Sequence, residues 1–244
     1  MKTFIVVLPA RMGSTRLNGK PLINIGGLPM IIRTYYQCLK AVDKKLIYVA
    51  TDSDEIKNIC EHYDVQCILT SEKCLTGTDR VAEVSKKIKA KFYINVQGDE
   101  PFFNPNDLKK LIIFAKKNPK DVINGYTEIK NKKLFESQSI PKVVFDKNNN
   151  LIYMSRAPIP SNKKKNFKIG WRQVCAYSCP IKSLEFFSKF KKKTIIESIE
   201  DIEILRFIEN GIKVKMIKMS DKSISIDEKD DLDKAKIYLK MKQR

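Results

Sequence analysis

The sequence contains a single histidine, His62, among its 244 residues. This scarcity excludes any mechanism that needs a second histidine, and no motif supports a Ser-His-Asp triad through His62. Six cysteines are present, but no two of them form a CxxC pair. With one histidine available, a zinc site has few candidate ligands. We therefore expect six reduced thiols that mostly contribute to packing.

Long apolar runs are also absent. The run at residues 4–8 follows Met1-Lys2-Thr3 directly and is too short for the core of a signal peptide. No stretch approaches the roughly 18 apolar residues of a membrane span. A hydrophobic content of 43% is typical of a globular chain, and this length suits one α/β domain with a substantial core. We expect a single-domain cytoplasmic protein spanning residues 1–244.

Acidic residues are scarce relative to basic ones, 28 against 47, which gives a formal net charge of +19. This charge raises a nucleic-acid-binding protein as an alternative from another class. The basic residues are mostly lysines spread along the chain, and the lysine triplets at 163–165 and 191–193 lack interleaved aromatics or a recognition-helix pattern. A solvated lysine-rich surface explains them better, and part of the charge can help attract an anionic nucleotide.

The loop that follows residues 4–8 has the most informative local pattern. It contains three cations, two glycines and two hydroxyls: Arg11, Gly13, Ser14, Thr15, Arg16, Gly19 and Lys20. Fixed cations beside small residues suit a nucleotide triphosphate that approaches the backbone closely. A solvated basic loop after an edge strand is the alternative. The loop matches neither GxxxxGK[ST] nor GxGxxG, so it is not a P-loop or a dinucleotide fingerprint.

Short β-branched runs alternate with amphipathic stretches along the first half of the chain. The expected strands are residues 46–50, 65–69 and 92–96, and helices follow Pro29, residues 51–55, Thr78 (as N-cap) and Asn104. Further on we expect a hairpin at 140–154, strands at 171–177 and 213–219, and helices at 183–190, 197–206 and 229–242. This order predicts a doubly wound α/β fold with a mostly parallel, mixed, Rossmann-like sheet. Ligands of such sheets bind at the carboxyl ends of the strands.

Two later blocks lie where this fold would place a ligand: residues 76–84 (TGTDRVAEV) and 95–101 (NVQGDEP). A carboxylate just past a strand, as Asp99 is here, is well placed to hold Mg²⁺ against phosphates. The alternative for Asp99 is a plain turn, because Gly, Asp and Pro all favour turns. Likewise, Gly77 and Thr78 would serve only to cap a helix if no nucleotide binds.

With the loop at residues 8–22, these blocks resemble the 3-deoxy-manno-octulosonate cytidylyltransferase family, the CMP-Kdo synthetases. The resemblance runs nearly end to end and weakens after about residue 161. A related polysaccharide-biosynthesis family shares the loop, so the loop alone does not define the substrate. The resemblance to the cytidylyltransferases implies a nucleotide-diphospho-sugar transferase fold with an inserted sugar-binding and dimerisation region at about 140–210. It also implies a Mg²⁺-dependent homodimer that transfers CMP from CTP to a 3-deoxy-2-keto sugar acid, for bacterial lipopolysaccharide or capsule.

The same resemblance implies roles for individual residues. Nucleotide contacts would come from Arg11, Ser14, Arg16, Lys20, Gly77, Thr78 and Arg80, with Arg11, Lys20 and Asp99 catalytic. Sugar-acid contacts would come from Gln97, Arg156, Gln173, Tyr177, Glu200 and Glu203. Asp99 and Asp227 would hold the metal. Lys142 is a weaker candidate, for which surface charge is the alternative.

Three positions depart from the family pattern. Gln173 stands where the family usually has histidine, Ile204 replaces a commonly polar residue, and Glu228-Lys229 stand in place of Thr-Pro. The first two fall on the sugar side, so 8-amino-Kdo or a nonulosonic acid is the alternative substrate to Kdo. A catalytically inactive nucleotide-binding regulator is a further alternative, although the basic loop and both aspartates are intact.

Overall fold

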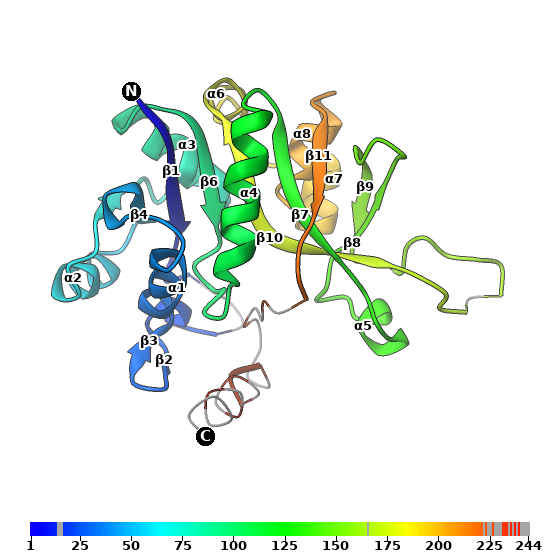
Figure 1. Cartoon of the computed structure of the whole chain (residues 1–244), viewed down its shortest axis with the longest axis horizontal. Coiled ribbons are helices and arrows are strands. Elements are labelled where there is room, and N and C mark those ends of the chain that lie inside the picture. The colour runs from blue at the N-terminus through cyan, green and yellow to red at the C-terminus, as the bar shows by residue number, and fades with distance from the viewer. Residues whose placement is uncertain are drawn as a thin grey trace.

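A computed structural model describes residues 1–13, 17–164, 166–221, 223, 226, 231–233, 235, 237 and 239. Within these residues one nine-stranded sheet forms the centre of the molecule (Figure 1). Its main strands, in spatial order, are β11 (Val214–Lys218), β7 (Val122–Glu128), β10 (Trp171–Pro180), β6 (Ala90–Val96), β1 (Lys2–Pro9), β4 (Ile47–Thr51) and β5 (Cys67–Leu69). The hairpin of β8 (Lys142–Phe145) and β9 (Leu151–Ser155) joins this sheet through β10. A separate small hairpin pairs β2 (Asn24–Ile25) with β3 (Leu28–Pro29).

The sheet is mixed and mostly parallel, as the sequence predicted. Strands β5, β4, β1 and β6 pair in parallel, and so do β7 and β11. Strand β10 runs antiparallel between β6 and β7. The carboxyl ends of β1 and β6 therefore lie side by side, which brings the basic loop close to the segment that contains Asp99.

Alternate side chains of β1 supply two hydrophobic cores, one on each face of the sheet. Phe4, Val6 and Leu8 pack with α1 (Met30–Leu39), α2 (Asp54–His62) and α4 (Pro105–Lys117). Ile5 and Val7 pack with α3 (Gly77–Lys87), α6 (Ile181–Phe187) and α8 (Leu205–Glu209). The remaining helical segments are α5 (Lys132–Glu136), α7 (Ile195–Glu200), η1 (Lys20–Leu22) and η2 (Lys44–Leu46). Both faces are thus covered, which explains why the central strands are mostly apolar.

Two expected elements differ from the structure. The N-cap of α3 is Thr76 and not Thr78, because Thr76 and Asp79 form a reciprocal capping box. The single helix expected at 197–206 is two helices, α7 and α8, interrupted at Asp201 in the left-handed region (φ 51°). An aspartate tolerates this conformation better than most residues. The predicted helix at 229–242 lies largely outside the described residues, and the described parts at 231–233, 235, 237 and 239 are helical.

No helix among the residues described here is both long enough and apolar enough to cross a membrane.

Candidate active site

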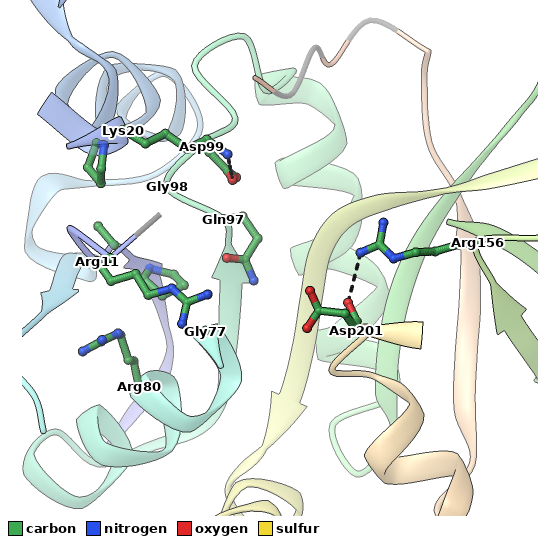
Figure 2. Close-up of a pocket in the computed structure, with 13 residues that line it drawn as sticks. Arg11, Lys20, Gly77, Arg80, Gln97, Gly98, Asp99, Arg156 and Asp201 are labelled. Carbon is green, nitrogen blue, oxygen red and sulfur yellow. Dashed lines mark hydrogen bonds and ion pairs between the residues drawn. The ribbon is translucent and has the colours of Figure 1, made fainter. Parts of the chain in front are cut away.

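A cleft of about 400 Å³ opens at the carboxyl ends of β1 and β6. Its lining includes seven of the predicted site residues and one that was not predicted: Arg11, Lys20, Gly77, Arg80, Gln97, Asp99, Arg156 and Asp201. Figure 2 shows two walls. Arg11, Lys20, Arg80 and Asp99 come from one side, Arg156 and Asp201 from the other, and Gln97 lies between them.

Lys20 and Asp99 form an ion pair on the first wall. The Lys20 Nζ–Asp99 Oδ2 distance is 2.6 Å, and the two side chains are 10% and 34% exposed. Lys20 begins the short helix η1, which follows Gly19 in the left-handed region (φ 63°). Gly98 packs against β1 so closely that a Cβ there would lie 2.8 Å from the Pro9 carbonyl oxygen. Because only glycine permits this approach, the backbone before Asp99 is fixed against the end of β1.

The first turn of α3 completes this wall. Gly77 allows the turn to pack against Gln97, since a Cβ on Gly77 would lie 2.7 Å from the Gln97 Nε2 atom. The amino end of an α-helix favours negative charge, which suits a phosphate in the cleft. Arg80, one turn further, is buried and donates to the Thr70 hydroxyl at 2.8 Å while it pairs with Asp52. Arg80 thus lines the cleft with its charge already paired.

On the opposite wall, Arg156 is held by backbone carbonyls. Its Nε donates to the Glu200 carbonyl at 2.6 Å, and its terminal nitrogens donate to the carbonyls of Asp201 and Gln138 at 3.1 Å each. The left-handed residue Asp201 turns the chain so that two of these carbonyls face Arg156. These contacts fix the guanidinium beside the cleft without a carboxylate partner among the hydrogen bonds it donates.

The Glu200 carboxylate supports Arg156 from behind. It accepts hydrogen bonds from the Ser155 hydroxyl at 2.6 Å, the Arg156 backbone N–H at 2.8 Å and the Tyr153 hydroxyl at 3.1 Å. Burial alone would raise the pKa of Glu200, but these three hydrogen bonds hold the pKa below its usual range. Glu200, predicted to contact the sugar acid, therefore has its acceptor capacity largely used within the protein.

From the sequence, Lys142 was either a contact to the sugar acid or a surface charge. The structure corrects the second interpretation, because Lys142 does not lie on the surface. The residue is fully buried, and its ammonium donates to the Ser137 carbonyl at 2.7 Å and to the Arg156 carbonyl. Burial, together with the Arg156 charge, lowers the pKa of Lys142 to about 8. Lys142 thus fixes the backbone of Arg156 from inside the protein.

Three predicted sugar-side positions lie away from the cleft lining. Gln173 is 6% exposed and donates to Asn124 Oδ1 and to the Tyr177 hydroxyl, each at 3.2 Å. Tyr177 is 3% exposed, and Ile204 is fully buried in the core. The structure does not bring these side chains to the cleft, and direct sugar contact by Gln173 and Tyr177 remains a prediction.

The chain matches the cytidylyltransferase family model over residues 5–222. It is 34% identical to the 3-deoxy-manno-octulosonate cytidylyltransferases of Chloroherpeton thalassium (98% of each chain) and Protochlamydia amoebophila (96% of this chain and 93% of the relative). The chain belongs to the 3-deoxy-manno-octulosonate cytidylyltransferase family. A solved CMP:2-keto-3-deoxy-manno-octonic acid synthetase complexed with CTP superposes with a TM-score of 0.90, at 29% identity over 99% of this chain and 100% of that one. Membership identifies the protein as a nucleotidyltransferase and confirms the predicted fold class.

Three residues that the family resemblance singled out, Ser14, Arg16 and Asp227, lie outside the described residues. Within the described part of the chain, no three His, Cys, Asp or Glu side chains gather as a preformed metal site. Of the two aspartates predicted to hold the metal, Asp99 is the one that the structure describes. Its carboxylate lines the cleft and is partly exposed, which suits a hard cation.

Two acidic residues in this cytidylyltransferase site were missed from sequence. Asp52 follows β4 and pairs with Arg80, although residues 51–55 indicated only a helix cap. Asp201 lines the cleft from the break between α7 and α8. The Lys193 ammonium beside Asp201 holds the pKa of its carboxyl below the usual range, and Arg156 and Arg11 add to this effect. No sequence signal located either residue, because Asp52 acts through Arg80, which is 28 residues away, and Asp201 is placed by the left-handed break after α7.

Proposed function

We propose that this protein transfers CMP from CTP to the anomeric hydroxyl of Kdo, a 3-deoxy-2-keto sugar acid. The hydroxyl oxygen bonds to the α-phosphorus, the α,β-phosphoanhydride bond breaks, pyrophosphate leaves, and the hydroxyl proton passes to solvent. Family membership supports the reaction class. The activity belongs to bacterial lipopolysaccharide or capsule synthesis, in the cytoplasm, by a homodimer whose inserted region at about 140–210 binds the sugar and the second subunit.

The observation that carries this proposal is the distribution of charge across the cleft. Arg11 and Lys20 lie on the wall that includes the helix α3 terminus, and Arg156 lies on the wall opposite. A triphosphate and a carboxylate are the two anionic groups of the proposed substrates. Cations on both walls suit two anions that meet in line between them.

Cations of both walls have a role in this reaction. Arg11 and Lys20 neutralise the triphosphate and the charge that builds on the departing pyrophosphate, as preorganised cations do most effectively. Arg156 binds the sugar carboxylate and orients the anomeric hydroxyl toward the α-phosphorus. Gln97, between the walls, contacts the sugar. No covalent intermediate is part of this scheme.

Mg²⁺ is the proposed cofactor, and Asp99 and Asp227 are its proposed protein ligands. Asp99 is the one of the two that the structure describes. Mg²⁺ commonly binds through one or two carboxylates together with substrate phosphates, and Asp99 fits this pattern. When bound, the ion supplies charge stabilisation to the phosphates. Lys20 donates to one Asp99 oxygen, so nucleotide binding has to replace this ion pair with separate phosphate and metal contacts.

Pyrophosphate release measured with CTP, UTP, ATP and GTP, each with a panel of keto sugar acids, tests the proposal. We expect turnover to require CTP and Mg²⁺ and to be fastest with Kdo. Comparable rates with a purine triphosphate would contradict the cytidylyltransferase assignment. Faster turnover of 8-amino-Kdo or a nonulosonic acid would keep the reaction and replace the sugar. Light scattering tests the homodimer.

A further inference from the structure

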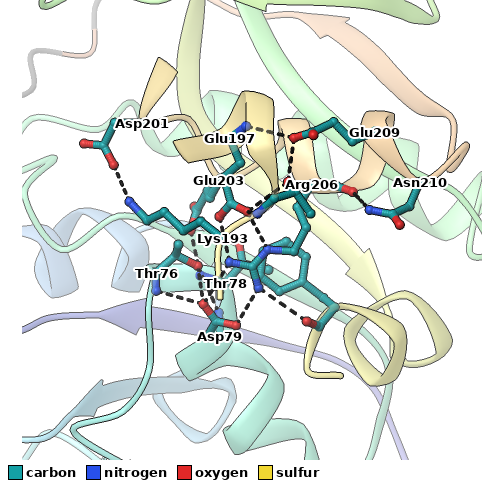
Figure 3. A network of polar contacts seen from close by, with 12 residues as sticks. Thr76, Thr78, Asp79, Lys193, Glu197, Asp201, Glu203, Arg206, Glu209 and Asn210 are labelled. Carbon is teal, nitrogen blue, oxygen red and sulfur yellow. Dashed lines mark hydrogen bonds and ion pairs between the residues drawn. The ribbon is translucent and has the colours of Figure 1, made fainter. Parts of the chain in front are cut away.

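The carboxylate of Glu203 lies where the two walls of the cleft meet. Its Oε2 accepts a hydrogen bond from the Thr78 backbone N–H at 2.8 Å, and its Oε1 accepts one from Gln97 Nε2 at 2.8 Å. These partners precede Glu203 by 125 and 106 residues. One side chain from the turn between α7 and α8 therefore joins the first turn of α3 to the residue that follows β6. Figure 3 shows Glu203 beside Thr78 at the start of α3.

A buried ion-pair network holds Glu203 in this position. Arg206, fully buried in the next turn of the chain, pairs with Asp79 at 2.8 Å and with Glu197 at 2.6 Å. Its guanidinium carbon lies 3.7 Å from the centre of the Phe187 ring. Asp79 belongs to the capping box of α3. Because the same network fixes α8 and the start of α3, the location of the Glu203 carboxylate is set by the fold.

This arrangement determines which end of the Gln97 amide faces the cleft. Because the Glu203 carboxylate accepts from the Thr78 N–H with one oxygen and from Gln97 Nε2 with the other, the Gln97 group that faces Glu203 is the NH₂. Gly77 encloses the amide on another side, since a Cβ there would lie within 2.9 Å of both amide atoms. The carbonyl oxygen of Gln97 is thereby left to accept a hydrogen bond from a ligand in the cleft that Gln97 lines.

We propose that Glu203 is a positioning residue that orients the Gln97 amide, so that the Gln97 carbonyl oxygen accepts a hydrogen bond from a hydroxyl of the bound sugar acid. This inference rests on the proposed function and specifies the chemistry of its sugar side. Gln97 selects a hydrogen-bond donor, while the anionic carboxylate of the sugar is recognised elsewhere. Glu203 acts through Gln97 and not by its own contact with the substrate.

The substitution Glu203→Gln isolates this role because it keeps the size of the side chain. The new carbonyl still accepts from the Thr78 N–H, but the new NH₂ faces the NH₂ of Gln97. The Gln97 amide then turns over and presents a donor to the sugar. We expect kcat/KM for the sugar acid to fall roughly 10- to 100-fold, the range for a lost hydrogen bond with mismatched buried partners. The KM for CTP should stay within about threefold.

Exchanging the two side chains provides the decisive comparison. In the double variant Gln97→Glu/Glu203→Gln, the amide at 203 donates to the carboxylate at 97, and an acceptor oxygen again faces the cleft. We expect the double variant to recover at least about fivefold in kcat/KM for the sugar acid over Glu203→Gln alone. A merely structural role for Glu203 predicts that the second substitution adds to the loss.

Glu209→Gln is the matched control. Glu209 is a carboxylate of the same segment that accepts from the Thr194 hydroxyl and from the backbone N–H of Ile196 and Glu197, away from the cleft. We expect it to lower the Tm without changing either KM. The Tm and calorimetric CTP affinity of every variant separate folding from catalysis.

The outcomes distinguish this inference from the proposed function. Absence of turnover by the wild-type protein with CTP and every sugar acid overturns the proposed function. An active wild type together with unchanged sugar kinetics in Glu203→Gln, or no recovery in the double variant, overturns the positioning role. If Glu203→Gln does not fold, the single variant Gln97→Glu tests the positioning role. In this variant the carboxylates at positions 97 and 203 are adjacent and share a proton, so its kcat/KM for the sugar acid should rise relative to that of the wild type as the pH falls. A pH profile parallel to that of the wild type contradicts the inference.

Discussion

Both walls of the cleft contain cations, but Lys20 and Arg156 are held in different ways. The first wall is formed by strand ends and a helix start within the first 99 residues, and Lys20 and Asp99 on it are paired with each other at the cleft. The second wall is formed by segments between residues 138 and 206, and its cation is held from inside the protein. Arg156 rests on backbone carbonyls, and Lys142 and Arg206 are fully buried.

This difference predicts different consequences of mutation. Asp99, the partner of Lys20, is 34% exposed, so solvent can replace this contact when Lys20 is removed, and Lys20 contributes mainly to binding and rate. A buried charge is matched by buried partners, so its removal leaves them without compensation and weakens the folded state. We therefore expect substitution of Lys20 on the first wall to reduce activity in a folded protein, and substitution of the buried cations behind the second wall to reduce stability.

Arg206→Ala should have the largest effect. It leaves Glu197, which is fully buried, and Asp79 without their cation. Removal of one partner from a buried ion pair costs about 3–5 kcal/mol of unfolding free energy. Urea denaturation measures this loss, with Lys215→Ala as the control, because Lys215 pairs with Asp121 on the surface. Equal stability of the two variants would contradict the distinction between the walls.

Lys20→Ala tests the first wall. A charge-assisted contact made to the transition state typically contributes about 2–4 kcal/mol, or roughly 30- to 1000-fold in rate. We expect kcat/KM with CTP to fall in this range while the Tm changes little. Lys44→Ala, which removes an exposed lysine paired with Asp64, is the control and should keep wild-type kinetics. Wild-type kinetics in folded Lys20→Ala would show that the loop is only a solvated surface.

The first wall could be predicted from the sequence, whereas the second wall could not. The first wall follows from local patterns: apolar runs identify β1 and β6, and the residues just after them lie at the carboxyl ends of parallel strands. Arg11, Lys20 and Asp99 were placed together for this reason. A helix cap was also predicted for this segment, although the N-cap is Thr76, two residues before the one expected.

The second wall depends on contacts between distant segments, which no local sequence pattern encodes. Nothing adjacent to Lys142 in the sequence indicates that the carbonyls of Ser137 and Arg156 surround it in a buried site. The helical periodicity of residues 197–206 predicted one continuous helix, but Asp201 interrupts it and exposes the carbonyls that bind Arg156. Tertiary contacts override helical propensity at this position.

The pH dependence of stability sharpens the comparison further. Lys142, which faces Arg156 and Glu200, has its pKa lowered to about 8 by burial. The unfolded chain holds this proton up to a higher pH, so folding becomes more favourable as the pH rises through 8. Between pH 7 and 9, wild type should gain roughly 1 kcal/mol relative to Lys142→Met, as measured by urea denaturation. A pH-independent difference would show that the buried lysine does not titrate in this window.

Gln173→His restores the usual family residue and should have the smallest effect. The Gln173 amide donates to both Asn124 and Tyr177, whereas a neutral imidazole has a single N–H and can serve only one of them. A lost hydrogen bond of about 0.5–1.5 kcal/mol corresponds to a change of roughly two- to tenfold. We expect this change in the ratio of kcat/KM for Kdo and 8-amino-Kdo, with the KM for CTP unaltered. Gln66→His, at an exposed glutamine that donates to the Lys44 carbonyl, is the control. If neither the ratio nor the absolute values move, Gln173 has no part in sugar selection, and its departure from the family pattern leaves the Kdo assignment intact.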